Sequence, residues 1–149
     1  MTTARLMELN RTWPIWEQGR QFELGTILNS AITDVLVPGE VGDLGVHHAG
    51  CWECDLFDNS LIWSGGVYDI FGLARGTPIT RDEIVTFYSE PSRSAMERLR
   101  GYAIKNKRGF SLDAEIYPAI GGVRWMRIIG APVVEGARVT RLHGLKLII

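Results

Sequence analysis

Two cysteines and two histidines lie within eight residues of one another, a grouping that could carry metal or redox chemistry. Cys51 and Cys54 are separated by two residues, and His47 and His48 precede them. Thiolate and imidazole groups are ligands of zinc, and a Cys-x-x-Cys pair can exchange disulfides. The alternating pattern of residues 50–56 predicts a strand, however, and residues three apart on a strand project to opposite faces. We therefore expect no metal site and no disulfide here, and we interpret Cys54 as a small core residue.

A second group of side chains has the character of a small-molecule pocket. These aromatic or large apolar residues are expected between a sheet and its helices: Trp52, Trp63, Phe71, Tyr88, Met96, Tyr102, Leu112 and Trp125. Such a lining suits a ligand pocket and suits a filled core equally well, and we favour the core.

Catalytic motifs are missing from the sequence. It contains no nucleophile elbow, phosphate-binding loop or paired-carboxylate site. His47, His48 and Asp55 are explained by positions in a surface loop and on an outward strand face. The chain is therefore predicted not to be an enzyme.

Length and composition limit the class of protein. The chain has 149 residues, 46% of them hydrophobic, with 16 Lys and Arg against 17 Asp and Glu. A chain of this length buries ~70% of its unfolded surface, which is enough for one core without disulfides or metals. Near-neutral charge argues against nucleic acid as a partner. No signal peptide is visible and no run approaches ~20 apolar residues, so we expect a cytoplasmic protein without a membrane span.

Hydrophobic periodicity changes along the chain from helical to strand-like. Apolar residues at spacings of three and four over 22–36 predict an amphipathic helix of roughly four turns, ended by Pro38. Alternation and turn signals predict five strands, over 50–56, 61–64, 110–117, 123–129 and 139–149. Short helices are expected near 65–73 and 80–88, and a longer one from Pro91. This order predicts an α+β domain with an antiparallel sheet and helices on one face.

A set of short motifs between residues 49 and 149 resembles the PAS (S-box) sensory family. The motifs are Gly50-x-Trp52-Glu53-x-Asp55-Leu56, Leu61-x-Trp63-Ser64, Tyr68-x-Ile70-Phe71-Gly72-Leu73, Pro91-x-Arg93, Phe110-x-x-x-x-Glu115, Gly122-Val123-Arg124-Trp125 and Leu142-x-Gly144. No single motif is specific, but their order and spacing together are. The resemblance implies a PAS fold, in which a five-stranded antiparallel sheet and helices on one face enclose a small cavity.

The resemblance also bears on cofactors. Haem-binding members of the family place an axial histidine on the long helix, and residues 91–108 contain none, which leaves only His143 on the last strand as a candidate. Flavin photochemistry needs a cysteine in the helical region, whereas both cysteines here lie on the first strand. No cofactor is therefore predicted. The alternative is a small ligand of unknown identity in the PAS cavity. The residues that would line the cavity are Trp63, Phe71, Tyr88, Met96, Tyr102, Leu112 and Trp125.

Two departures from the family pattern concern the helix start and the output. The acidic helix start of the family is shortened to Pro91-Ser92-Arg93, and Ile148 stands where the family ends its last strand in aspartate. Output through a following helix is therefore not expected within this chain. The chain is either a stand-alone PAS protein or an excised fragment, and its start at Met1 with its own helix favours the former.

The predicted N-terminal helix carries an apolar stripe that needs a cover. Its members are Leu24, Ile27, Leu28, Ile32, Val35 and Leu36. The stripe can pack on a second copy as a homodimer interface or fold back on its own sheet, and we favour the dimer. We thus divide the chain into an N-terminal helical segment, 1–45, and a PAS domain, 46–149.

The resemblance implies a bacterial signalling role. The preferred function is a non-catalytic regulator that acts through protein–protein contacts on a histidine kinase or another two-component protein. The alternative is a sensor that binds a small molecule in the PAS cavity.

Overall fold

The computed structural model of the chain describes residues 25–27 and 48–149. Six antiparallel strands form one sheet in the order β1-β4-β5-β6-β2-β3. Their bounds are β1 Thr26–Ile27, β2 Ala49–Asp55, β3 Leu61–Trp63, β4 Phe110–Ile116, β5 Arg124–Glu135 and β6 Arg138–Ile148. The five strands β2 to β6 confirm the predicted five-stranded sheet, and β1 adds a two-residue strand at its edge.

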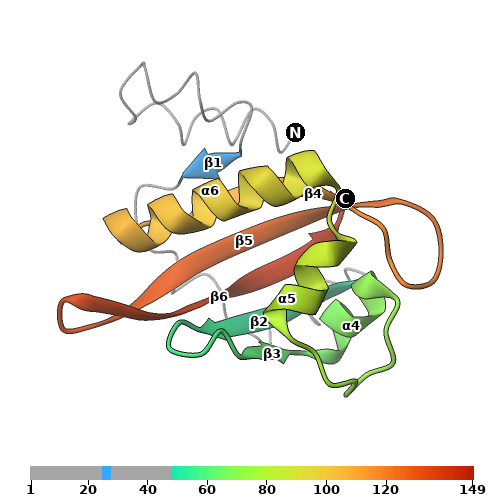
Figure 1. Cartoon of the computed structure of the whole chain (residues 1–149), viewed down its shortest axis with the longest axis horizontal. Coiled ribbons are helices and arrows are strands. Elements are labelled where there is room, and N and C mark those ends of the chain that lie inside the picture. Colours follow the sequence, from blue (N-terminus) through green and yellow to red (C-terminus); the bar gives the residue numbers. More distant parts are fainter. Residues whose placement is uncertain (1–24, 28–47) are drawn as a thin grey trace.

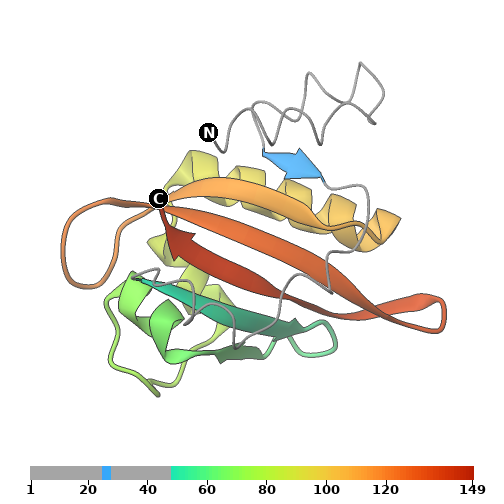
Figure 2. The ribbon, with the colours of Figure 1, turned by 180° about the vertical axis from the view of Figure 1, so that it is seen from behind.

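The helices cover one face of this sheet, whose other face is turned to the viewer in Figure 2 (Figures 1 and 2). They are α4 Gly65–Phe71, α5 Arg81–Ile84, the 3-10 turn η2 Val85–Phe87 and α6 Glu90–Asn106. Within the described ranges, no helix is long and apolar enough to cross a membrane. The architecture is the α+β fold that the sequence predicts.

Side-chain caps start α5 and α6. The Thr80 side chain accepts a hydrogen bond from the amide of Glu83 and donates one to the Glu83 carboxylate, so Thr80 caps α5 and also holds the side chain of Glu83 at the helix start. Ser89 accepts a hydrogen bond from the amide of Ser92, and Pro91 occupies the first turn of α6. These caps fix the start of α5 and α6 and therefore the direction in which both cross the sheet.

Arg124 ties the end of α4 to the sheet. Its Nη1 donates hydrogen bonds to the carbonyl oxygens of Asp69 and Ile70, at 3.0 and 2.8 Å. The last carbonyls of a helix lack intrahelical partners and carry partial negative charge, so a guanidinium stabilises them. The arginine of the Gly-Val-Arg-Trp motif thereby holds α4 against the start of β5.

The predicted helix over 22–36 is wrong at residues 26 and 27, which form β1. Thr26 pairs with Ser111 and Ile27 with Phe110, so β1 extends the sheet along the free edge of β4. The backbone groups of an edge strand need partners, and this pairing supplies them where a helix could not. The remaining residues of that prediction lie outside the described part of the chain.

Candidate functional site

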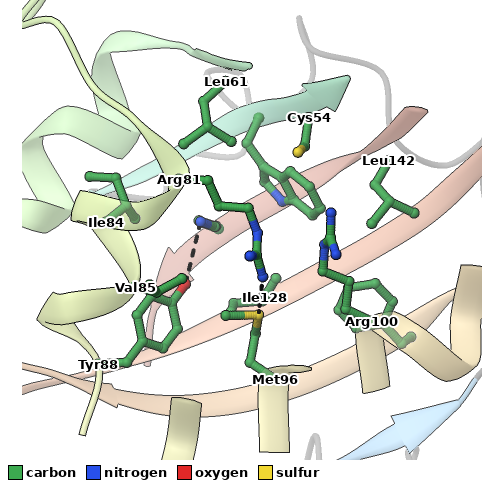
Figure 3. A pocket seen from close by; sticks show the side chains of 13 residues that line it. Cys54, Leu61, Arg81, Ile84, Val85, Tyr88, Met96, Arg100, Ile128 and Leu142 are labelled. Carbon is green, nitrogen blue, oxygen red and sulfur yellow. Dashed lines mark hydrogen bonds between the residues drawn. The ribbon is translucent and has the colours of Figure 1, made fainter. Parts of the chain in front are cut away.

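An internal cavity of about 60 Å³ lies between the inner face of the sheet and the helices (Figure 3). Its apolar wall includes Trp52, Ile84, Val85, Met96, Phe110 and Ile128. Its polar and charged lining consists of Cys54, Arg81, Tyr88, Arg100 and Lys146. Among the described residues, no Asp or Glu lines the cavity. A space of this size holds a few water molecules or a ligand of a few non-hydrogen atoms.

Lys146 is the central residue of this cavity. On β6 its side chain points to the same face of the sheet as that of Leu142, which faces the core, and only 7% of the surface of Lys146 is exposed. Its Nζ is 5.4 Å from the ring centroids of Trp52 and Trp63 and 5.2 Å from that of Phe71. Aromatic ring faces attract a cation at such distances. The amine is thus held inside a cage of three rings.

The hydrogen-bonding partners of Lys146 are few. Its Nζ donates a long hydrogen bond of 3.5 Å to the Tyr88 hydroxyl, drawn as a dashed line in Figure 3. No salt bridge joins Lys146 to any carboxylate of residues 25–27 or 48–149. Burial is the main reason that the pKa of Lys146 is lowered to about 7; of the smaller influences, Cys54 raises this pKa and Arg81 lowers it. Burial also raises the pKa of Tyr88, so its hydroxyl stays protonated.

Two arginines stand at the more exposed side of the cavity, beside Leu61, which is also partly exposed. Arg81 forms an ion pair with Glu97 on α6 and donates a hydrogen bond to the sulfur of Met96 at 3.9 Å (Figure 3). Arg100 donates to the side-chain oxygen of Asn59 at 3.1 Å, bridging α6 to the β2–β3 turn. These partly exposed side chains mark the opening of the cavity and make it electropositive.

Glycines on two neighbouring strands give the cavity its shape. Gly130 on β5 is the pairing partner of Gly144 on β6, and Gly144 is in turn the pairing partner of Trp52 on β2. A methyl group at Gly130 would lie 2.6 Å from the ring of Phe110 and 3.0 Å from that of Trp52. The indole nitrogen of Trp52 donates to the carbonyl oxygen of Leu145 at 3.2 Å. The glycines therefore leave room for the two rings that form the floor of the cavity.

The predicted pocket residues divide into three groups. Tyr88 and Met96 line the cavity, and Trp63 and Phe71 stand behind the amine of Lys146 with their rings stacked at 4.8 Å. Leu112 is buried in the core and Tyr102 packs against it, but neither lines the cavity. Binding of a ligand by any of them remains a prediction.

The prediction that Trp125 lines the pocket is wrong. It is 50% exposed, whereas its neighbour Met126 is fully buried. Strand β5 carries apolar residues on both faces, so alternation alone left open which of the two points inward. The pairing of Trp125 with Glu115 and of Met126 with Ala114 places the tryptophan on the outer face of the sheet.

The cysteines and histidines do not converge. Cys54 is buried and lines the cavity, as expected of a core residue, whereas Cys51 is half-buried on the other face of β2. Within the described ranges, no three ligating side chains come together in a way that could hold a metal; His47 lies outside those ranges. His143 alternates with Leu142 and Gly144 and does not line the cavity. Burial lowers the pKa of His143.

The predicted dimer stripe is represented in the structure by one residue. Ile27 is fully buried and belongs to the hydrophobic core of the chain, so it is not on a free surface. Leu24, Leu28, Ile32, Val35 and Leu36 lie outside the described residues.

Lys146, Arg81 and Arg100 did not stand out from the sequence. A signal for Lys146 is present, because Leu142, Gly144, Lys146 and Ile148 share the inward register of a strand and lysine is the one charged residue among them. Nothing in the local sequence distinguishes Arg81 or Arg100 from the other exposed basic residues of helices.

Comparisons with known proteins identify the fold. No family model and no curated protein sequence matches the chain. Solved structures do match. A sensory box histidine kinase/response regulator from Burkholderia thailandensis E264 has a TM-score of 0.63 at 14% identity, over 76% of this chain and 85% of that one. The N-terminal domain of a diguanylate cyclase with PAS/PAC sensor from Marinobacter aquaeolei has a TM-score of 0.61 at 13% identity, over 67% and 94%.

A third similar structure belongs to a longer protein. An RNA-binding Light-Oxygen-Voltage receptor matches with a TM-score of 0.60 at 15% identity, over 67% of this chain and 29% of that one. The chain thus spans less than a third of that receptor. Together, the sheet order, the helices on one face and these matches show that the chain has the PAS fold.

Proposed function

We propose that this chain is a non-catalytic sensory domain that binds a small molecule in its internal cavity and signals the occupied state to a partner protein. The observation that carries the proposal is Lys146, a buried residue whose amine faces a cavity and has no carboxylate partner in the part of the chain that the structure describes. Burying an amine without a charged partner is costly, and protein cores normally fill such positions with apolar side chains. A ligand that contacts the amine explains both the cavity and the lysine.

The position of Leu61 allows this proposal to be tested from the partly exposed side of the cavity. Leu61 lines the opening of the cavity, whereas Ile62, the next residue on β3, is 66% exposed on the other face. We expect Leu61→Trp to block the opening and Ile62→Trp to leave it free. Binding is measured by NMR titration with a panel of small carboxylates, amides, alcohols and amines.

At least one compound of the panel is expected to shift the signals of cavity residues in the wild-type protein and in Ile62→Trp. In Leu61→Trp the apparent affinity of that compound should fall about tenfold or more, because the larger side chain takes up space that the ligand needs. A tenfold loss of affinity corresponds to ~1.4 kcal/mol of binding free energy. A panel in which no compound perturbs the cavity of the wild-type protein would contradict ligand sensing.

We further propose that the domain works as a homodimer through the part of the predicted apolar stripe that follows β1, namely Leu28, Ile32, Val35 and Leu36. This part of the proposal rests on the sequence pattern. Replacing Ile32 with aspartate is expected to leave a folded monomer, because a carboxylate in an apolar interface loses its hydration without a partner. Light scattering gives the mass, and circular dichroism checks the fold. A variant that remains dimeric would rule out this interface.

The partner is proposed to be a histidine kinase or another two-component protein. Support comes from the similar structures, which include those of a sensory box histidine kinase/response regulator and of the N-terminal domain of a diguanylate cyclase with PAS/PAC sensor.

A further inference from the structure

The internal cavity has an excess of positive charge that the described protein groups do not neutralise. Arg81 is paired with Glu97, and Arg100 donates a hydrogen bond to the neutral amide oxygen of Asn59. Lys146 has no acidic partner among the described residues, and its hydrogen bond to Tyr88 is long, at 3.5 Å. Within the described part of the chain, Arg81 is thus the one of the three cations that pairs with a carboxylate, and the most deeply buried cation, Lys146, does not.

We propose that the cavity binds a short aliphatic carboxylate, whose charged group pairs with Lys146 while its hydrocarbon part lies against the apolar wall. This inference rests on the proposed function and specifies the ligand class of the same site. A carboxylate placed against the Nζ would form a charge-assisted hydrogen bond, which is stronger than a bond between neutral groups.

Tyr88 provides a second donor for the same ligand group. Its hydroxyl oxygen accepts the hydrogen bond from Lys146, so its own proton remains available to a ligand in the cavity. The ring of Tyr88 lines the cavity beside Met96 and holds the hydroxyl there (Figure 3). One ammonium and one hydroxyl match the two oxygens of a carboxylate. A phosphate or sulfate has more oxygens than these buried donors can satisfy.

The size of the cavity limits the hydrocarbon part. At about 60 Å³ the cavity is less than half of the ~150 Å³ that an engineered apolar cavity uses to hold benzene. The cavity therefore encloses the carboxylate group and only part of a hydrocarbon chain; the end of a propionate chain would extend to the partly exposed side beside Leu61, and a benzoate would require the side chains to move. The side chains against which it would lie include Ile84, Val85 and Ile128.

Binding of such a ligand depends on pH through Lys146. The groups that face its amine or line the same cavity are Cys54 on β2, Arg81 on α5, Tyr88 after η2 and Arg100 on α6, and Glu97 on α6 pairs with Arg81. Because burial lowers the pKa of Lys146 to about 7, the amine is charged below that pH and neutral above it. The affinity for a carboxylate is therefore expected to be constant where the amine is charged and the ligand is ionised, and to fall about tenfold per pH unit well above 7.

The test compares propionate with propionamide, which has nearly the same shape and no charge. The full chain is titrated with each compound by NMR, at about pH 6 and about pH 8.5. Lys146→Met removes the amine and keeps the apolar stem, and Lys105→Met removes an exposed lysine of α6 that does not line the cavity. We expect propionate to bind the wild-type protein and Lys105→Met at least tenfold more tightly than it binds Lys146→Met. Propionate should also bind more tightly than propionamide at the lower pH.

The other outcomes distinguish this inference from the proposed function. If propionamide binds as tightly as propionate, or if Lys146→Met binds propionate as the wild-type protein does, the carboxylate inference is overturned while a small-molecule site remains. If neither compound perturbs the cavity signals but another compound of the panel does, the ligand class is wrong and sensing still holds. Shifts confined to exposed residues would likewise overturn the inference.

Discussion

Replacing Lys146 with methionine is expected to stabilise the folded protein at pH 7. The methionine fills the space of the lysine stem and removes an amine that is 7% exposed and has no carboxylate partner among the described residues. Exchanging a buried charged group for an apolar side chain of similar volume is often neutral or stabilising by ~1–4 kcal/mol. We expect a gain in the free energy of unfolding of about 2–4 kcal/mol, since this lysine lacks a salt bridge that would offset its desolvation.

The same lysine gives stability a distinctive pH dependence. Its pKa is about 7 in the folded protein and rises to the ordinary 10.5 on unfolding, so between these values the unfolded chain binds the extra proton. Stability therefore increases as pH rises above 7. From about pH 7 to about pH 9 the expected gain in the free energy of unfolding is ~2 kcal/mol, which Lys146→Met should abolish.

Other described groups with shifted pKa values contribute less in this window. Burial lowers the pKa of His143 below 6.5, so its effect on stability is largely complete near pH 7 and has the same sign. Burial raises the pKa of Cys51 above 9.0 and that of Tyr88 above 10.0; Cys51 begins to oppose the trend as pH approaches 9, and Tyr88 does so at higher pH. Urea unfolding of the wild-type protein, Lys146→Met and Lys105→Met at several pH values measures the effect. A wild-type stability that is flat between pH 7 and 9 would show that the amine is not desolvated as described.

Most of the sheet could be predicted from the sequence because each strand carries its own local pattern. The inward register of β2, with Trp52 and Cys54, depends only on near neighbours, and the structure confirms it. The cap that Thr80 provides for the amide of Glu83 is a local feature of the same kind. Trp125 and Ile27 show where local patterns are insufficient. For Trp125, the strand has apolar residues on both faces, so its sequence does not show which face points to the core. For Ile27, the helical spacing of apolar residues gives no sign that the edge of β4 lies nearby and needs a pairing partner.

The candidate site depends on contacts between distant segments, which no local pattern contains. Lys146 meets the rings of Trp52, Trp63 and Phe71 only after β6 has paired with β2. Its inward register could have been read from the alternation around it. The absence of an acidic partner within residues 25–27 and 48–149 is instead a property of the packed structure, and the proposed ligand rests on it.

Gly144 is expected to be the glycine least tolerant of substitution in the sheet, and Gly144→Ala tests how closely β5 and β6 approach at the cavity. A methyl group built on Gly144 overlaps the carbonyl group of Ile129 and lies 3.0 Å from the Cα of Gly130. These are backbone atoms of the neighbouring strand. They cannot move without disturbing the pairing of β6 with β5 and, through Trp52, with β2.

Overpacking of this kind costs ~1–3 kcal/mol when side chains can adjust, and we expect about 3 kcal/mol or more here because only backbone can give way. Gly101 provides the matched control, since it lies in α6 with nothing within 4 Å of an added methyl group. Gly101→Ala should stabilise the protein by about 0.5–1 kcal/mol, because alanine loses less conformational freedom in a helix. Urea unfolding measures both variants. A loss of less than about 1 kcal/mol in Gly144→Ala would mean that β5 and β6 have room for a methyl group at this point. The packing of Trp52 and Phe110 against Gly130, which forms the floor of the cavity, would then be less tight than described.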